Sequence, residues 1–319
     1  MKRSFFSSKL LVALTLMFFA FSCDKDEPAT MEADASGDFS VEMTDAPVDD
    51  ANVKAVFVTV SDVRVDGNSL EGFSSTTLEI SALTNGNTEM IFDGQLAADT
   101  YSKLEIVLED GMDAVNGGPG CYVLTSDDTK IALEAANDGV ITLADSDFTI
   151  SESSETAAVI DFDLRKALVR ADDETKPYRF ATESRLEESV RFVTRDRSGT
   201  LTGTVTNNTE EEGTVVVYAY AQGTYQASEA QGDSDDALFL NAVSSTTLNS
   251  NMEYTLAFLE AGNYELVAVS YEDTDNDGSL EMKGSFELQG TTGLDLLGLL
   301  EVKANSSTTA NFSLNAWQN

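Results

Sequence analysis

The stretch that decides the fold of this chain is Ala55-Val56-Phe57-Val58-Thr59-Val60. Its residues are β-branched or apolar, as in a central sandwich strand that is covered on both faces. Further along, Leu104, Ile106 and Leu108 alternate with charged residues, which predicts a strand with one face in water. Both patterns favour an all-β fold.

Strands continue to the end of the chain, separated by turn signals such as Asp66-Gly67. In the C-terminal half we expect strands at Thr200–Val205, Thr214–Ala221, Tyr254–Leu259, Tyr264–Tyr271, Leu280–Leu288 and Thr308–Leu314. Glu183–Glu188 is the one candidate helix, and the Gly- and Ser-rich segment 222–236 is typical of a mobile loop. We therefore predict two tandem antiparallel β-sandwich domains, at residues 37–196 and 197–319.

The composition excludes several function classes. The chain has 56 acidic and 19 basic residues, a formal net charge of −37 and no histidine. Nucleic-acid binding needs basic patches for phosphate, so a nucleic-acid partner is not expected. The lack of histidine removes Ser-His-Asp and Cys-His catalysis and His-ligated zinc, copper or iron.

The first 22 residues have the parts of a secretory signal peptide. Lys2 and Arg3 precede an apolar stretch, Leu10–Phe21, which is too short to span a membrane. The following Ser22-Cys23 resembles a bacterial lipoprotein cleavage site. This resemblance implies that Cys23 is lipidated and anchors the chain to a membrane; the alternative is an ordinary signal peptide with an incidental cysteine.

Residues 23–36 are expected to form a flexible acidic tether. Within them, Asp24-Lys25-Asp26-Glu27 is similar to the export signal of lipoproteins in Bacteroidetes-type bacteria. That resemblance implies a place on the outer membrane, facing the cell exterior. A protein that faces the periplasm is the alternative.

Cys121 is the second of the two cysteines. With Cys23 lipidated, no intramolecular disulfide can form. We expect Cys121 to be a small buried hydrophobe; the alternative, a catalytic thiolate, has no histidine to activate it.

Residues 37 to about 190 resemble the DUF4382 family of exported bacterial and archaeal proteins. The resemblance is carried by Gly37–Pro47, which includes Thr-Asp-Ala-Pro, by Asn52–Val60, by the Leu96–Tyr101 turn and by Ile160–Asp163. It implies an exported β-sandwich of uncharacterised activity and carries no catalytic residues over to this chain.

Residues 199–319 are similar to carboxypeptidase-regulatory-like and transthyretin-like β-sandwiches. The similarity rests on Gly203-Thr204-Val205 and on the turn Leu259–Tyr264, which repeats the pattern of Leu96–Tyr101. It implies a second sandwich of similar design.

An acidic loop near the C-terminus carries the best local motif for chemistry. Asp273, Asp275 and Asp277 stand at its first, third and fifth positions and Gly278 at the sixth. Carboxylates at this spacing surround one point, as calcium requires. The predicted calcium ligands are Asp273, Asp275, Asp277, Ser279 and Glu281. The alternative is an acidic hairpin tip in which Asp277-Gly278 forms a type I′ turn, and no other cofactor is expected.

A second acidic cluster, Asp45, Asp49 and Asp50, surrounds the Thr-Asp-Ala-Pro element. We expect Asp45 to cap its own turn before Ala46-Pro47 through its side chain. A second cation site is the alternative.

Basic residues cluster between Arg165 and Arg197. In one hypothesis they neutralise nearby acids and connect the two domains. In the other they form an anion-binding patch, for instance for acidic polysaccharide, that comprises Arg165, Arg170, Arg179, Arg185 and Arg191.

Asp161 and Asp163 could be read as the paired carboxylates of a glycosidase, since residues two apart on a strand lie about 6.6 Å apart on one face. Their alternation with Ile160, Phe162 and Leu164 is equally typical of a strand with one wet face. We therefore expect a non-catalytic cell-surface lipoprotein, a binding or structural module for an extracellular polysaccharide or protein. The alternatives are a carboxylate-based, glycan-directed extracellular hydrolase and a periplasm-facing envelope protein.

Overall fold

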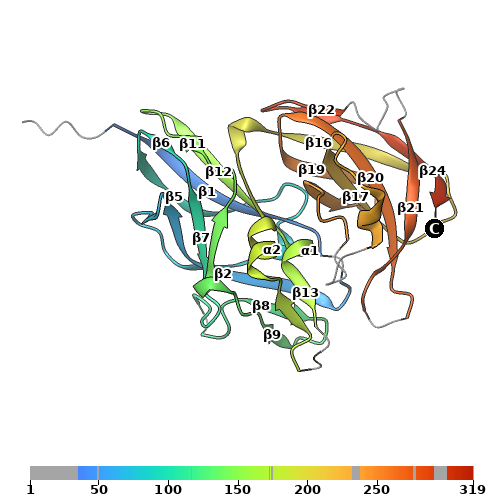
Figure 1. Ribbon diagram of the computed structural model, residues 1–319, viewed down its shortest axis with the longest axis horizontal. Helices are drawn as coiled ribbons and strands as arrows, with labels where there is room; N and C mark the ends of the chain where they lie inside the picture. The colour runs from blue at the N-terminus through green and yellow to red at the C-terminus, as the bar shows by residue number, and fades with distance from the viewer. Residues whose placement is uncertain are drawn as a thin grey trace, which may run out of the picture. The chain divides into compact units, whose positions relative to one another are not determined.

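Strand β2 (Val53–Val65) contains the apolar stretch that decides the fold and lies in the middle of its sheet in the computed structural model (Figure 1). It has antiparallel neighbours on both sides, which confirms the prediction of a central strand. In spatial order the sheet contains β10 (Val140–Leu143), β7 (Leu104–Leu108), β2, β8 (Tyr122–Thr125) and β9 (Lys130–Ala132), and both β3 (Asn68–Ser69) and β4 (Thr76–Glu79) also pair with β2.

The structure describes residues 35–319 except 49, 116, 172, 174, 232–237, 276–277, 291–299 and 319. This part forms one compact unit, in which no helix is long and apolar enough to cross a membrane. The predicted signal segment 1–22, Cys23 and nearly all of the tether lie outside the described residues. The predicted division at residue 197 stays a prediction, although strand pairing changes to a new sheet at that point.

A second sheet faces the first across the core of residues 36–194, the N-terminal part. In spatial order it contains β15 (Val190–Thr194), β12 (Glu155–Asp163), β1 (Ser36–Ala46) and β5 (Glu89–Ala97). Most pairings are antiparallel as predicted, whereas β1 and β12 are parallel, with Asp45 beside Phe162. The whole first sheet lies between them in the chain and supplies the long connection that a parallel pair needs. Val41 and Met43 of β1 and Val56 and Val58 of β2 are fully buried in the core.

Short elements complete the N-terminal part. They are β6 (Thr100–Tyr101) with β11 (Phe148–Thr149), β13 (Leu168–Arg170) with β14 (Tyr178–Phe180), the helices α1 (Leu164–Ala167) and α2 (Glu183–Glu188), and the 3-10 turns η1 (Ile80–Ala82), η2 (Asn137–Gly139) and η3 (Arg195–Arg197). Helix α2 has the bounds of the predicted helix.

Residues 198–318, the C-terminal part, form one curled sheet. Its order is β18 (Ser244–Thr247), β17 (Thr214–Ala221), β20 (Gly262–Glu272), β21 (Glu281–Gly290), β24 (Phe312–Gln318), β16 (Ser198–Asn207) and β19 (Glu253–Glu260), with β22 (Leu300–Val302) on β20 and β23 (Ser307–Thr309) on β16. Each predicted strand is present, the last one divided into β23 and β24. The short strands β18 and β22 were not predicted, because neither has an alternating pattern long enough to stand out.

Strand β17 is buried on both faces. Val217 faces the main core of the C-terminal part, while Tyr218 and Tyr220 face a second apolar cluster with Tyr271 and Phe239. The hydroxyls of Tyr218 and Tyr271 are 2.7 Å apart. Part of the segment predicted as a loop, η4 (Ala227–Gln231), is ordered beside this cluster, and residues 232–237 lie outside the described residues.

Two strand faces predicted to be wet are buried. Glu105 of β7 is 7% exposed, and Asp161 and Asp163 of β12 are each 6% exposed. The reason is that each carboxylate has a basic partner: Lys103 lies 2.6 Å from Glu105, and arginines pair with the two aspartates. The alternation correctly predicts that Asp161 and Asp163 share one face of β12. Tertiary packing determines whether water or a basic side chain lies against that face.

The repeated Leu–Tyr turn has the same hydrogen bond in both parts. The Tyr101 hydroxyl donates to the Ala97 carbonyl at 2.9 Å, and the Tyr264 hydroxyl donates to the Glu260 carbonyl at 2.9 Å. A tyrosine hydroxyl that donates a hydrogen bond to a backbone carbonyl four residues upstream fixes the start of a strand to the preceding turn, as in a tyrosine corner.

Candidate metal centre

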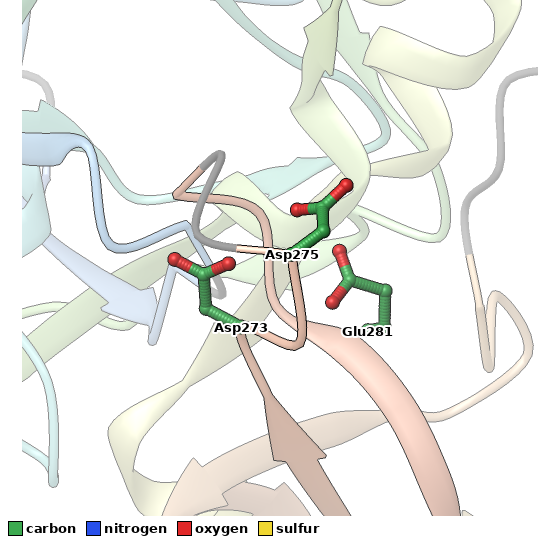
Figure 2. Close-up of side chains that lie close together, drawn as sticks. All are labelled: Asp273, Asp275 and Glu281. Carbon is green, nitrogen blue, oxygen red and sulfur yellow. The ribbon is translucent and has the colours of Figure 1, made fainter.

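Three of the five predicted calcium ligands meet in the loop between β20 and β21. Carboxylate oxygens of Asp273, Asp275 and Glu281 lie within 4.8 Å of one another (Figure 2). Asp277 lies outside the described residues. Ser279 forms an isolated β-bridge with Asp50 of the N-terminal part. Elsewhere in the described part of the chain, no other group of three such side chains converges.

Hydrogen bonds hold the two ends of this loop together. Asp273 accepts the backbone N–H of Gly278 at 3.0 Å through Oδ2, while its Oδ1 is buried and has no hydrogen-bond partner among the described residues. Glu281 accepts both the backbone N–H and the hydroxyl of Thr274 at 2.8 Å through Oε2. The carboxylates are therefore oriented by the loop itself.

Gly278 brings the loop against the N-terminal part. It has φ +87°, and its carbonyl accepts the N–H of Ala51 at 2.9 Å. A Cβ on Gly278 would lie 1.8 Å from Nδ2 of Asn52. Both the left-handed backbone and the close approach require glycine here.

The donor set fits a hard cation. All the converging atoms are carboxylate oxygens, which calcium and magnesium prefer to nitrogen or sulfur. Calcium takes 6–8 oxygens in flexible geometry, so backbone carbonyls or water would complete its shell. The loop differs from an EF-hand because strands, not helices, flank it.

Of the acidic cluster near the Thr-Asp-Ala-Pro element, the two described members, Asp45 and Asp50, have different hydrogen-bond partners. Asp45 accepts the N–H of Leu164, the first residue of α1, at 3.1 Å, with a weaker backbone hydrogen bond from Ala46. The Asp45 side chain therefore bonds its own turn and also the start of α1, which it can reach because β1 and β12 lie side by side. Asp50 instead accepts the Tyr178 hydroxyl at 3.0 Å, and Asp49 lies outside the described residues.

Arg165 and Lys166 connect the two parts. Arg165 is 7% exposed and pairs with Asp163 at 2.9 Å, and its Nη1 donates to the carbonyl of Leu238 at 2.7 Å. Its guanidinium lies 5.0 Å from the ring centre of Tyr218. Lys166 donates to the carbonyl of Ala242 at 2.8 Å.

Arg191 makes a similar connection from β15. It pairs with Asp161 at 2.6 Å and donates to the carbonyl of Phe258 at 2.6 Å. Arg195 pairs with Glu42 and lies over the ring of Phe258. These contacts favour the hypothesis that the basic cluster neutralises acids and connects the parts.

The remaining members of the predicted anion patch have other partners or lie on another element. Arg170 is 4.0 Å from a carboxylate oxygen of Asp50, Arg179 donates to the carbonyl of Phe180 at 3.2 Å, and Arg185 lies on α2. Lys176, on the exposed surface, pairs with Glu134 at 2.7 Å. An anion site made of all five arginines stays a prediction.

The pair Asp161 and Asp163 lines a cavity with Lys166, Arg191 and Tyr264. Burial alone would raise the pKa of Asp163, but the charges of Arg165 and Lys166 outweigh it and the pKa lies below the ordinary value. A glycosidase acid must hold a proton near neutral pH. Asp163 is therefore unsuited to that role.

Cys121 is fully buried and donates weakly to the carbonyl of Glu109 at 3.6 Å. Burial raises the pKa of its thiol to about 12. The thiol is thus protonated near neutral pH, which agrees with its predicted role as a small hydrophobe.

Part of the chain is similar to one protein family. Residues 36–180 match the family described as "Domain of unknown function (DUF4382)". The match confirms the resemblance seen in the Thr-Asp-Ala-Pro region and covers less than half of the chain. No curated protein sequence matches.

Several solved structures are also similar at a low level. The TIE protein of Bacillus anthracis is 12% identical, with 88% of this chain and 35% of that chain covered and a TM-score of 0.20. This chain thus spans about a third of its length. BcpA, the major pilin subunit of Bacillus cereus, is 10% identical, with 88% and 70% covered and a TM-score of 0.20. The minor pilin GBS52 of Streptococcus agalactiae is 9% identical, with 88% and 97% covered and a TM-score of 0.20. At such TM-scores the likeness supports no inference about function.

Proposed function

We propose that this chain is a non-catalytic, exported binding or structural module whose C-terminal part binds one calcium ion. The observation that carries the proposal is the convergence of Asp273, Asp275 and Glu281 within 4.8 Å. Three carboxylates without a cation at that separation repel one another, and a bound divalent cation removes the repulsion.

The residues of the loop have different roles in this proposal. Asp273 offers its buried Oδ1, and Asp275 and Glu281 offer carboxylate oxygens from the two sides of the loop. Asp277, which lies outside the described residues, remains a predicted ligand. Because Gly278 bonds to Ala51, an ion in this loop also orders the contact with the N-terminal part.

Calcium is expected to raise the thermal midpoint of the full chain, whereas chelator and magnesium are not. Calcium present at about 100 times its Kd stabilises the folded state by about 2.7 kcal/mol through mass action. Magnesium demands a tighter octahedron and keeps its water, so it is the matched ion control. Titration calorimetry with calcium chloride should show one saturable site.

Asp275→Asn is expected to remove the calcium response because the amide keeps the shape and loses the charge. Asp128→Asn is the matched control, since Asp128 is an exposed acid that pairs with Lys54 far from the loop in sequence. A calcium-dependent rise that persists in Asp275→Asn would contradict the proposed ligand set.

The non-catalytic character is inferred from the state of the buried acids. Asp161 and Asp163 each accept hydrogen bonds from an arginine, at 2.6 and 2.9 Å. A carboxylate held in an ion pair is poorly suited to donate a proton to a leaving group. Binding of an extracellular polysaccharide or protein is the proposed task, and the net charge of −37 disfavours a polyanion.

The proposed location is the outer membrane, with a lipid anchor at Cys23 and the chain facing the exterior. Cys23→Ser is expected to abolish partition of the exported protein into the detergent phase, because a chain without acyl groups has no membrane anchor. Protease treatment of intact cells tests the orientation: cleavage supports surface display, and full protection supports the periplasmic alternative. Retention of the Cys23→Ser protein in the membrane fraction would contradict the anchor.

A further inference from the structure

A small cavity lies where the Thr-Asp-Ala-Pro element meets strands of the C-terminal part. Its volume is about 10 Å³, close to the space of one water molecule. It is lined by Thr44, Asp45, Asn85, Gly86, Asp161, Ser244, Ser245, Thr255, Ala257 and Phe258. Most of these residues present oxygen atoms, so the cavity suits a polar occupant.

Two residues that line the cavity, one from each part, have a buried side-chain oxygen with no hydrogen-bond partner among the described residues. The oxygens are Oδ2 of Asp45 and Oγ of Ser245, and the residues are 6% and 5% exposed. A buried polar atom without a partner costs the free energy of its lost hydration. Such a cost at two atoms on one cavity indicates that something bridges them.

The charges around Asp45 make a positive occupant favourable. Burial raises the pKa of Asp45 well above its ordinary value, and the carboxylates of Asp163 and Asp161 on β12 raise it further. The neighbouring basic side chains form ion pairs with other carboxylates. Arg191 of β15 pairs with Asp161, and Arg165 and Lys166 of α1 pair with Asp163. Asp45 alone in this group lacks a positive partner of its own among the described residues.

We propose that this cavity binds a single dehydrated monovalent cation of the size of sodium, held by Oδ2 of Asp45 and Oγ of Ser245. The site joins strand β1 of the N-terminal part to β18 of the C-terminal part. The negative charge of the Asp45 carboxylate, whose Oδ2 has no hydrogen-bond partner among the described residues, would balance the single positive charge of the ion. Calcium needs 6–8 oxygens and usually several carboxylates, and magnesium keeps waters for which this cavity has no room.

The test compares thermal midpoints of the full chain in sodium chloride and in choline chloride at equal ionic strength, at pH 8 and with chelator present. Equal ionic strength holds charge screening constant, and the chelator removes any contribution of the 273–281 loop. We expect the wild type to melt about 2–4 °C higher in sodium. Asp45→Asn and Ser245→Ala should lose this difference, and Asp128→Asn should keep it.

Three results would overturn the proposal. Equal midpoints in sodium and choline would mean that the cavity holds water only. A rise on acidification that is the same in both salts would mean that Asp45 binds a proton instead of a cation. A sodium effect that survives in both Asp45→Asn and Ser245→Ala would place the ion elsewhere. Because calcium is absent throughout, none of these outcomes depends on the proposed calcium site.

Discussion

Replacing Arg165 by methionine is expected to lower the free energy of unfolding by about 3–5 kcal/mol. Arg165 is 7% exposed, and its removal leaves the carboxylate of Asp163 buried with only Lys166, at 3.4 Å, as a cation. The substitution also removes the donors to the carbonyls of Leu238 and Phe239. Removing one partner of a buried ion pair costs more than the intact pair contributes, which is why the single substitution is severe.

Urea unfolding of the wild type, Arg165→Met, Asp163→Asn and the double variant measures the coupling between the two side chains. The double variant is expected to be less destabilised than the sum of the single variants, because it no longer buries the Asp163 carboxylate without the Arg165 guanidinium. Arg64→Met is the control: Arg64 pairs with Asp62 at the partly exposed surface, where such a pair contributes about 0–1 kcal/mol. Equal effects of Arg165→Met and Arg64→Met would refute the structural role of Arg165.

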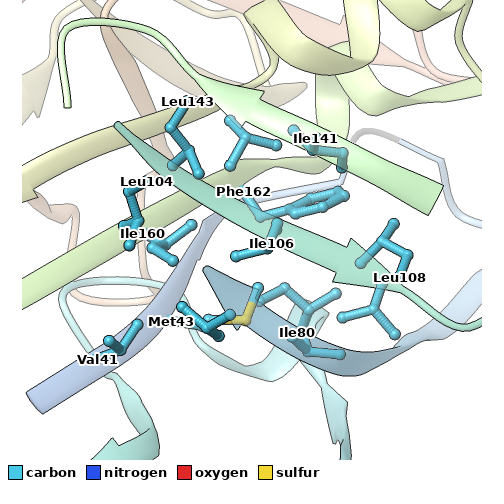
Figure 3. Close-up of a cluster of buried hydrophobic side chains, with 14 of the residues drawn as sticks. Val41, Met43, Ile80, Leu104, Ile106, Leu108, Ile141, Leu143, Ile160 and Phe162 are labelled. Carbon is cyan, nitrogen blue, oxygen red and sulfur yellow. The ribbon is translucent and has the colours of Figure 1, made fainter. Parts of the chain in front are cut away.

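Replacing Phe162 by alanine is expected to destabilise the chain by about 3–5 kcal/mol. Phe162 is fully buried on β12, and its ring centre lies 6.4 Å from that of Phe180. Figure 3 shows it among Ile106, Ile141 and Ile160, within the N-terminal core. The alanine variant loses the buried ring surface and leaves a cavity that rigid strands cannot close.

Calorimetric unfolding of Phe162→Ala, with Phe73→Ala as the matched control, checks this expectation. Phe73 is only partly buried at the edge of the same core, so its loss should cost much less. Phe162→Leu should recover part of the stability, because leucine refills some of the space. A loss below about 1 kcal/mol for Phe162→Ala, the size of an ordinary surface effect, would mean that β12 is not central to the core.

The loop at 273–281 shows what the spacing of acidic residues can predict and what it cannot. Asp273, Asp275 and Glu281 were predicted together because acids at alternate positions before a glycine surround one point, and local backbone geometry brings them together. The contact of Gly278 with Ala51 was not predictable, because it joins residues more than 200 positions apart. A glycine in a turn signals positive φ and does not signal which surface it approaches.

The acids of β12 show the opposite case. The alternation at 160–164 predicts the strand, the shared face of Asp161 and Asp163 and contact of that face with water, whereas both aspartates are buried. Their burial depends on Arg165 and Arg191, each of which bonds a carbonyl of the C-terminal part. The one sequence signal for this burial is the high density of basic residues between Arg165 and Arg197. That density is compatible both with a connection between the two domains and with an anion-binding patch.

Local sequence patterns were enough to predict the all-β class, most strands of the C-terminal part, the short helix at 183–188 and the grouping of Asp273, Asp275 and Glu281. Side-chain periodicity and turn chemistry act over a few residues. Three features became visible only in the tertiary structure. They are the parallel pairing of β1 with β12, the hydrogen bond from the Leu164 N–H to Asp45, and the small cavity that both Asp45 and Ser245 line. Each of these depends on contacts between distant segments. Such contacts depend on how the whole core packs, and a local sequence pattern does not predict that packing.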